Sequence, residues 1–304
     1  MDSEEIRGKV RKIMESNSIR IVTFNLRCVW QGCDGINDFI HRAGMVYDKI
    51  MHELPDVILF QEVVAPHLTL LRRMLPEYTF CGHFRDADYT GEGVFTAVRR
   101  DRMEMLGMDS YWLSPTPYVP GSRYENQSVC PRTCLTVVVR DTQTGARIRT
   151  LNTHLDHISD EARILGIRQI LARLKEDSAK DGLPFVLAGD FNATPDSDTI
   201  RFCNTYTALP MTDVTAEIPV TFHDWGRAAE KIDYIYVPQA MHDAVQSVAA
   251  WTDETNGIYL SDHYPVAMVL DAAQISAKRL DKRKRIPAPI TYDRCFNKAI
   301  PEND

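Results

Sequence analysis

Short apolar runs that end in polar residues alternate along the chain with segments whose apolar residues recur every three or four positions. The short runs predict β-strands, and the longer spacing predicts amphipathic helices. Helices are predicted over residues 37–53, after Pro66, and from Ser159 or Asp160 onward. Strands are predicted at Arg20–Phe24, Val57–Phe60, Tyr78–Cys81, Val94–Val98, Thr133–Arg140, Arg147–Leu151, Phe185–Gly189, Ile232–Val237, Val248–Trp251 and Tyr264–Leu270.

The order of these elements indicates the fold class. Helices separate the early and the late strands, whereas the central strands follow one another, with a hairpin turn predicted at Asp141–Ala146. Such mixed pairing favours an α+β fold over a doubly wound sheet, namely an α/β-sandwich of two packed mixed β-sheets flanked by helices. The segment Ser114–Gly121 is too rich in proline for a helix or a central strand, so we expect a surface loop that borders the functional site.

The layered pattern predicts one domain over residues 19–271, with residues 1–18 as a lead-in and 272–304 as a basic, proline-containing tail. Lysines and arginines gather between Lys278 and Arg285 in this tail. A solvated or disordered end is the first interpretation of such a charge run, and contact with a phosphate surface is the second.

Composition narrows the class of protein. The formal net charge of −7 disfavours avid binding to long duplex DNA, because phosphate neutralisation supplies most non-specific affinity, although it leaves room for a small phosphate ester held by a cation. No apolar stretch of about 18 residues predicts a membrane span, and the acidic N-terminus lacks the apolar core of a signal peptide. Seven scattered cysteines without a Cys-x2-Cys pair favour reduced thiols in the cytoplasm over a zinc site.

Polar groups stand at one end of three predicted strands. Asn152-Thr153-His154-Leu155 and Asp190-Phe191-Asn192 end two of them, and Ser261-Asp262-His263-Tyr264 opens the last. In a packed core each of these groups would need a buried partner. A hydrolytic site at the edge of a sheet explains all three strings at once.

Two further strand ends offer oxygen ligands. Glu62 follows the apolar run Val57–Phe60, and Asn25 follows Arg20–Phe24. Mg²⁺ prefers one or two carboxylates together with water and substrate oxygens, so it would make this placement useful. A solvated strand end is the alternative for both residues.

Asp190 and Asn192 differ by two positions, so on an extended backbone they would project to the same side. The carboxylate could then orient or deprotonate water, while the amide donates to a phosphoryl oxygen. An Asx-turn before Pro195 is the alternative interpretation.

Asp262 and His263 are neighbours in the sequence and would face opposite ways on a strand, so Asp262 is not expected to pair with His263. Asp233, at the start of an apolar strand, is the better partner. An Asp–His pair raises the basicity of the imidazole and fixes its tautomer, as a general base or a phosphate-binding cation requires.

His154 is the second candidate imidazole, although one residue among His154, Asp156 and His157 could instead cap the following helix. Glu92 could orient His154. Arg132 could hold a phosphoryl oxygen through two hydrogen bonds.

Taken together, these strings resemble the endonuclease/exonuclease/phosphatase (DNase I-like) superfamily. The resemblance covers residues 19–270, and further strings, among them Arg27 and Tyr111–Pro117, are similar to a microbial branch. The chain lacks the longer basic stretch of the inositol phosphatases and the leucine-rich repeats of some deadenylases. The blocks that carry the resemblance are Thr23-Phe24-Asn25, Phe60-Gln61-Glu62, Asn152-Thr153-His154-Leu155, Gly189-Asp190-Phe191-Asn192, Ile232-Asp233-Tyr234 and Ser261-Asp262-His263-Tyr264-Pro265.

The resemblance implies a four-layer sandwich and a set of roles. Glu62 would bind Mg²⁺, with Mn²⁺ as the alternative, and Asn25 and Asp262 would lie near the metal. Asp190 would activate water, and Asn192 and Arg132 would contact phosphate. Asp233 would support His263, and Glu92 would support His154.

The expected activity is metal-dependent hydrolysis of a phosphodiester, small or single-stranded, by in-line attack of water. Hydrolysis of a sugar, inositol or phospholipid head-group phosphomonoester is the alternative. A catalytically silent member that binds a phosphorylated ligand is another, and no obligate protein partner is evident. Every block of the constellation is intact, which favours an enzyme.

Overall fold

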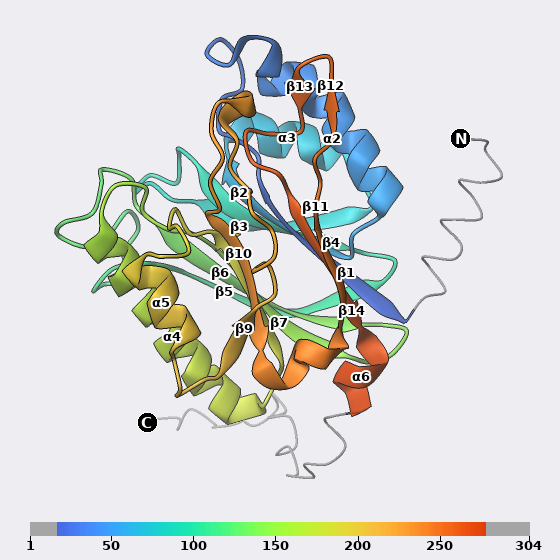
Figure 1. Ribbon diagram of the computed structural model, residues 1–304, viewed down its shortest axis with the longest axis vertical. Helices are drawn as coiled ribbons and strands as arrows, with labels where there is room; N and C mark the ends of the chain where they lie inside the picture. The colour runs from blue at the N-terminus through green and yellow to red at the C-terminus, as the bar shows by residue number, and fades with distance from the viewer. Residues whose placement is uncertain (1–16, 278–304) are drawn as a thin grey trace, which may run out of the picture.

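The fold of the protein, seen in a computed structural model that describes residues 17–277, is a sandwich of two six-stranded mixed sheets (Figure 1). The first sheet has the order β11-β14-β1-β2-β4-β3 and the second β5-β6-β7-β8-β10-β9. Helices α2 and α3 cover the outer face of the first sheet, and α4 and α5 cover that of the second.

The strands of the first sheet are β1 (Ser18–Asn25), β2 (Val57–Val63), β3 (Tyr78–Phe84), β4 (Gly93–Arg99), β11 (Val245–Ala250) and β14 (Val266–Asp271). Those of the second are β5 (Met103–Trp112), β6 (Thr133–Asp141), β7 (Arg147–His154), β8 (Phe185–Asp190), β9 (Met211–Asp213) and β10 (Asp233–Pro238). The α-helices are α2 (Phe39–Glu53), α3 (Ala65–Met74), α4 (Asp160–Asp181), α5 (Asp198–Asn204) and α6 (Ala272–Ala277). Smaller elements are η1 (Gly35–Asn37), η2 (Asp224–Gly226), η3 (Gln239–Ala244) and the hairpin of β12 (Glu254–Thr255) and β13 (Ile258–Tyr259).

Side chains that point alternately to the two faces of each sheet form the core between the sheets and the cores beneath the helices. In β1, Ile19 and Ile21 point into the core between the two sheets, whereas Val22 and Phe24 point outward to α2 and α3. A separate core joins the second sheet to α4 and α5. Because both faces of the central strands are buried, runs such as Val57–Phe60 in β2 and Phe185–Ala188 in β8 are continuously apolar, as the pattern of hydrophobic positions predicts. The four-layer sandwich expected from the sequence is confirmed.

Strand direction brings the polar strand ends together. β1 is parallel to β2 and β7 is parallel to β8, so the carboxyl ends within each pair lie side by side. The antiparallel strands β10 and β14 begin at that edge, because Asp233 pairs with Asp190 and Val266 pairs with Thr23. The edge therefore collects residues from six distant segments.

The predicted helix starts are largely correct. Ser159 caps α4 by accepting a hydrogen bond from the backbone N–H of Ala162, and Pro66 stands in the first turn of α3. In α2, however, Ile40 and Tyr47 from the predicted apolar face are 47% and 36% exposed. Within the described chain, no helix is long and apolar enough to cross a membrane.

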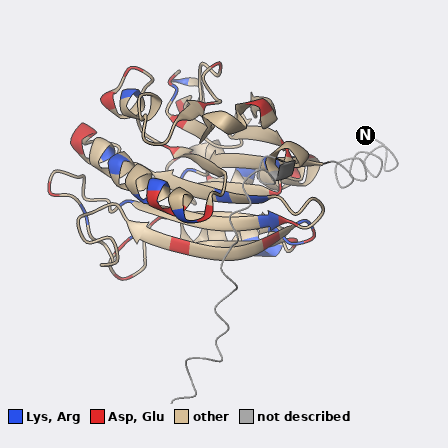
Figure 2. Cartoon of the chain, turned by 90° about the horizontal axis from the view of Figure 1, so that it is seen from below, with Lys and Arg blue, Asp and Glu red and all other residues tan. Residues whose placement is uncertain are grey.

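The domain extends beyond the expected boundary at residue 271. Helix α6 follows β14 directly, and Ala272 and Ile275 belong to the core between the sheets. The basic cluster of the predicted tail and residues 1–16 of the predicted lead-in 1–18 lie outside the described residues, and Ser18 already belongs to β1. Acidic and basic positions are interspersed along the elements seen in Figure 2, and no broad basic stripe crosses that view.

The Pro-rich segment Ser114–Gly121 forms no helix or strand, as predicted. It is held against α4 by a hydrogen bond from Ser114 N to Gln169 and by contact of Arg173 with Tyr118. The part of this long connection that lines the functional pocket is Pro131 and Arg132.

Candidate active site

Asn25 bridges two carboxylates at the carboxyl ends of β1, β2 and β8. Its Nδ2 donates to Glu62 Oε1 and to Asp190 Oδ2, both at 2.9 Å, and its Oδ1 accepts from the backbone N–H of Arg27. Asn25 and Asp190 are almost fully buried. The amide thus holds side chains from the two sheets at a fixed separation across the sandwich.

Glu62 does not simply follow a strand, as the sequence suggested, but lies inside β2 at a register shift between β2 and β4. Its φ of 57° is left-handed, a conformation that a non-glycine residue adopts at a cost and that is common at functional sites. The backbone N–H of Cys28 donates to Glu62 Oε2 at 2.8 Å. Burial raises the pKa of Glu62, but the hydrogen bond from Asn25 and the charge of His263 outweigh burial and lower it, so Glu62 is ionised at neutral pH.

His263 and Asp233 form a buried pair, as the sequence predicts. His263 Nδ1 lies 2.8 Å from Asp233 Oδ2, and its Nε2 lies 3.8 Å from Asp190 Oδ2. Burial alone would lower the pKa of His263, but the charge and hydrogen bond of Asp233 outweigh it and raise this pKa to about 10. The imidazolium is therefore charged at neutral pH and presents Nε2–H toward the carboxylate of Asp190.

Asp190 lies between the two imidazoles. Its Oδ2 is 3.4 Å from His154 Nε2, and burial together with the charge of Asp233 raises the pKa of Asp190 to about 7. Burial and the positive charge of Arg132 hold the pKa of His154 well below its usual value, so that ring is neutral. A carboxylate with a pKa near 7 is suited to accept a proton from water at neutral pH.

Asn192 reaches the site by a different route from the one expected. β8 ends at Asp190, and Asn192 has a left-handed φ of 48°, so the two residues are not on one extended strand. Asp190 Oδ1 instead accepts from Asn192 N at 2.8 Å, which is the Asx-turn considered as the alternative. Asn192 Nδ2 donates to Leu155 O, which leaves its second N–H and its oxygen for other partners.

Asp262 lies at the rim and is engaged by a cation. Its Oδ2 is 3.6 Å from Arg27 Nε, and its Oδ1 accepts from Ser261 Oγ. Burial raises the pKa of Asp262. The neighbouring His263 pairs with Asp233, as predicted, although both residues precede β14 and do not lie on a regular strand.

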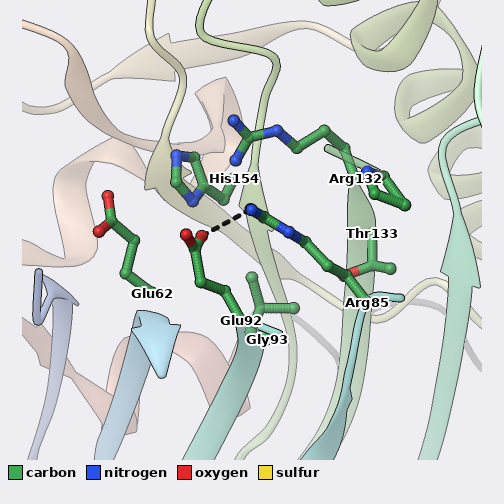
Figure 3. Close-up of a pocket in the computed structure, with 9 residues that line it drawn as sticks. Glu62, Arg85, Glu92, Gly93, Arg132, Thr133 and His154 are labelled. Carbon is green, nitrogen blue, oxygen red and sulfur yellow. Dashed lines mark ion pairs between the residues drawn. The ribbon is translucent and has the colours of Figure 1, made fainter. Parts of the chain in front are cut away.

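A pocket opens beside His154 and is lined by Glu62, Arg85, Glu92, Arg132 and Thr133, among others (Figure 3). The expected support of His154 by Glu92 is replaced by an ion pair, in which Glu92 Oε2 lies 2.6 Å from Arg85 Nη1. Burial and the charge of Glu62 raise the pKa of Glu92. The carboxylate partner that the structure gives His154 is Asp190.

Arg132 is 4% exposed at the back of this pocket. Its Nη2 lies 2.8 Å from His157 Nδ1, and its Nε lies 3.9 Å from Asp156. Asp156 itself accepts from the backbone N–H groups of Ile158 and Ser159. Of the His154-Leu155-Asp156-His157 string, Asp156 therefore secures the start of α4, whereas His154 faces the site.

The donor set fits a hard divalent cation. Glu62, His154 and Asp190 place one ligand atom each within 4.8 Å of one another, and so do two further groups, Cys28 with Glu62 and Glu92, and Asp190 with Asp233 and His263. Glu62 is ionised and offers oxygen, the ligand type that Mg²⁺ and Mn²⁺ prefer. His263 is protonated and paired, so it is better suited to bind an anion than a metal.

Sequence reasoning missed several residues of the site. Arg85 comes from the connection after β3, Cys28 follows β1, and Arg42 donates from α2 to Leu26 O and Leu260 O behind the site. Arg27 is singled out in the sequence only as part of the similarity to a microbial branch, without a role beside Asp262. Arg85 carries no local pattern that distinguishes it from a solvated loop arginine.

Comparisons with known proteins agree with this geometry. The sequence profile described as the endonuclease/exonuclease/phosphatase family matches residues 22–263. Mouse tyrosyl-DNA phosphodiesterase 2 is 25% identical over 184 residues, which are 59% of this chain and 42% of that protein, so the chain spans less than half the length of this relative.

Solved structures share the fold. An endonuclease/exonuclease/phosphatase from Bacteroides vulgatus is 32% identical, with a TM-score of 0.77 over 84% of this chain and 99% of that one. A mannosyl-6-phosphatase from Bacteroides thetaiotaomicron is 23% identical, with a TM-score of 0.72 over 82% and 98%. With the profile covering most of its length and the layered fold in place, this chain belongs to the endonuclease/exonuclease/phosphatase family.

Proposed function

We propose that the protein is a Mg²⁺-dependent phosphoesterase that hydrolyses a phosphodiester by in-line attack of an activated water. The observation that carries this proposal is the cluster in which Asn25 holds the carboxylates of Glu62 and Asp190 together beside the Asp233–His263 pair. An ionised carboxylate ligand, a base whose pKa is near 7 and a buried cation therefore lie within one site. Water attack on a phosphoester needs each of these.

Glu62 would hold the cation, with Asn25 and Asp262 as the further oxygen donors nearby. When bound, Mg²⁺ supplies charge neutralisation at the phosphoryl oxygens. Asp190 accepts the proton of the attacking water, because its carboxylate is poised near pKa 7. His263 donates from Nε2 to a phosphoryl oxygen while Asp233 keeps the ring charged.

The remaining residues position the substrate. His154 is neutral and 3.4 Å from Asp190, so it can hydrogen-bond a phosphoryl oxygen or the water without adding charge. Asn192 offers its unused N–H and oxygen from the turn after β8. Arg132 and the ion-paired Glu92 line the adjoining pocket and would contact the ester from that side.

Three considerations support a phosphodiester that is small or single-stranded. The mouse relative is named for a phosphodiesterase activity. A structural neighbour, tyrosyl-DNA phosphodiesterase 2 from D. rerio, was solved with single-stranded DNA product, although at 18% identity it shares the fold alone. The net charge of −7 opposes binding of long duplex DNA. The cytoplasm stays our expected compartment, since the six described cysteines are unpaired thiols.

A substrate panel tests the proposal. Purified protein with Mg²⁺ or Mn²⁺ is offered chromogenic phosphodiesters, short oligonucleotides and phosphomonoesters of sugars, inositol and phospholipid head groups. We expect diester hydrolysis that Asp190→Asn and His263→Ala each abolish. If only the monoesters are hydrolysed, the protein is a phosphomonoesterase and the proposed diester substrate is wrong. If no compound is hydrolysed, the result points to a catalytically silent member that binds a phosphorylated ligand.

A further inference from the structure

The pocket beside His154 contains a cationic group that the proposed reaction does not use, Arg85, close to Arg132, which faces the ester from the same side. Arg85 comes from the connection after β3 and Arg132 immediately precedes β6, and their guanidinium groups approach Glu92 and His154 from two directions (Figure 3). Glu62 and Glu92 line the same pocket; with Glu62 committed to the cation in the proposed reaction, the two guanidinium groups face one carboxylate, Glu92, so one positive charge stays unmatched.

Several guanidinium N–H groups in this pocket have no hydrogen-bond partner. Arg132 Nε and Nη1 are buried without one, although Asp156 lies 3.9 Å from Nε, and Arg85 Nε is also buried without one. Leaving such donors unpaired in a buried place costs free energy, and a bound oxyanion removes that cost. Planar guanidinium groups match phosphate oxygens through pairs of hydrogen bonds.

The pocket adjoins the proposed reacting centre and shares Glu62 and His154 with it. Asp190, Asp233 and His263 form one cluster, and Cys28, Glu62 and Glu92 form another. Glu62 and His154, which cluster with Asp190 and also line the pocket, stand between the two regions. A substrate whose scissile phosphate lies at Asp190 and His263 would therefore extend past Glu62 and His154 to Arg85 and Arg132.

The pocket is also built as a fixed structure. Arg85 N donates to Glu92 O, and Trp112 Nε1 donates to Arg85 O, so the backbone that carries Arg85 is tied to two strands. Ser128 Oγ donates a hydrogen bond to Asp156 Oδ2, and this contact joins the connection before β6 to the segment before α4. Donors held in this way lose little entropy when an anion binds.

We propose that Arg85 and Arg132 form a subsite for a second phosphoryl group, so the preferred substrates carry a phosphate a few bonds away from the scissile ester. This inference rests on the proposed phosphoesterase function and names its substrate class. Glu92 holds Arg85 in place through their ion pair, in which the two side chains are 20% and 11% exposed.

A matched pair of substrates tests the subsite. The p-nitrophenyl ester of thymidine 5′-phosphate is compared with the same ester that also carries a 3′-phosphate, so the scissile bond is identical. We expect wild-type protein to favour the bisphosphate by roughly 10-fold or more in kcat/KM, since hydrogen bonds to charged groups are worth this much. The ratio cancels any effect that is common to both substrates.

The variant is Arg85→Gln combined with Glu92→Gln, which removes the cation without leaving Glu92 unpaired. It should reduce the ratio several-fold, with Arg132 left as the second donor, whereas the remote, exposed Arg73→Gln should leave it unchanged. An equal preference in wild type and the double variant, or no preference in wild type, would overturn the subsite.

A second measurement does not need turnover. In the presence of EDTA, inorganic phosphate at about 20 mM should raise the melting temperature of wild type more than that of the double variant. Equal shifts would contradict the subsite even if both esters were hydrolysed. If neither ester is hydrolysed but phosphate raises the melting temperature in a way that depends on Arg85, the proposed reaction is wrong and the anion pocket stands.

Discussion

Replacement of Asp233 by asparagine tests whether the charge of His263 takes part in the reaction. The two side chains are 3% and 5% exposed, with Nδ1 and Oδ2 2.8 Å apart. The pKa of about 10 for His263, against 6.5 for a free imidazole, corresponds to about 5 kcal/mol that favours the charged form in the folded protein. Asparagine keeps the shape and the hydrogen-bonding capacity of the side chain but removes most of this stabilisation.

In the Asp233→Asn variant the burial of His263 is no longer opposed by the carboxylate, so its pKa should fall to about 6. The charged fraction would then be about one in thirty at pH 7.5 and more than half at pH 5.5. The pKa of Asp190 falls as well, because the charge of Asp233 is one of its causes. Both changes move the activity of the variant toward acid.

The assay is kcat/KM for a chromogenic phosphodiester from pH 5.5 to 9, measured for wild type and variant. The ratio of wild type to variant should be at least about 30 at pH 7.5 and should shrink by roughly 10-fold at pH 5.5. Asp243→Asn is the matched control, because Asp243 stands 3.9 Å from His242 on the surface. Parallel pH profiles for wild type and Asp233→Asn would refute the role given to the imidazolium.

Stability offers a second readout of the same change. Because the folded pKa of His263 is raised, its contribution to the free energy of unfolding is complete below pH 6.5 and is lost as the pH rises through about 10. Asp233→Asn should therefore flatten the decline of stability between these pH values. Urea denaturation at pH 6.5 and pH 9 measures the difference.

Three stability predictions concern the scaffold. His67 is buried, and burial and the charge of Arg42 lower its pKa to about 3. The free energy of unfolding of wild type should therefore fall by about 2 kcal/mol from pH 6.5 to pH 5, and that of His67→Phe should fall markedly less, as measured by urea denaturation. Equal losses would count against burial of the neutral ring. Gly189→Ala places a Cβ 1.9 Å from Thr153 O at a φ of +147°, so we expect a loss of about 3 kcal/mol or more, and an unchanged melting temperature would disprove the close approach of β7 and β8. Ser159→Ala removes the cap of α4 and should cost about 1 kcal/mol, whereas Ser159→Asp should retain it in the same denaturation assay.

The layered fold could be predicted because burial on both faces leaves a strong pattern in the sequence. Val57–Phe60 in β2 and Phe185–Ala188 in β8 are uninterrupted apolar runs, and α4 has a capping serine at its start. β5 was missed, since it is an edge strand with a run of exposed residues and a register shift between Met105 and Gly107. Its pairing with β6, rather than its own pattern, defines it.

Much of the candidate site could be predicted because its polar residues directly adjoin strands. The sequence could not specify how Asn25 bridges the two sheets, since that contact depends on residues 165 positions apart. It also gave Glu92 a different partner, because Glu92 pairs with Arg85, which faces it across the connection between β3 and β4. Long-range packing determines the contact of Asn25, and the geometry of the hairpin determines that of Glu92.

The central claim is that Glu62 and Asp190 form one metal-dependent hydrolytic site. The most direct test is the initial rate of phosphodiester hydrolysis as Mg²⁺ is titrated into EDTA-treated protein, for wild type and Glu62→Gln. We predict saturable Mg²⁺ activation of wild type and a loss of at least about 100-fold in the variant, together with a much weaker response to Mg²⁺. Turnover in EDTA equal to that with Mg²⁺, or an unchanged Mg²⁺ dependence in Glu62→Gln, would contradict it.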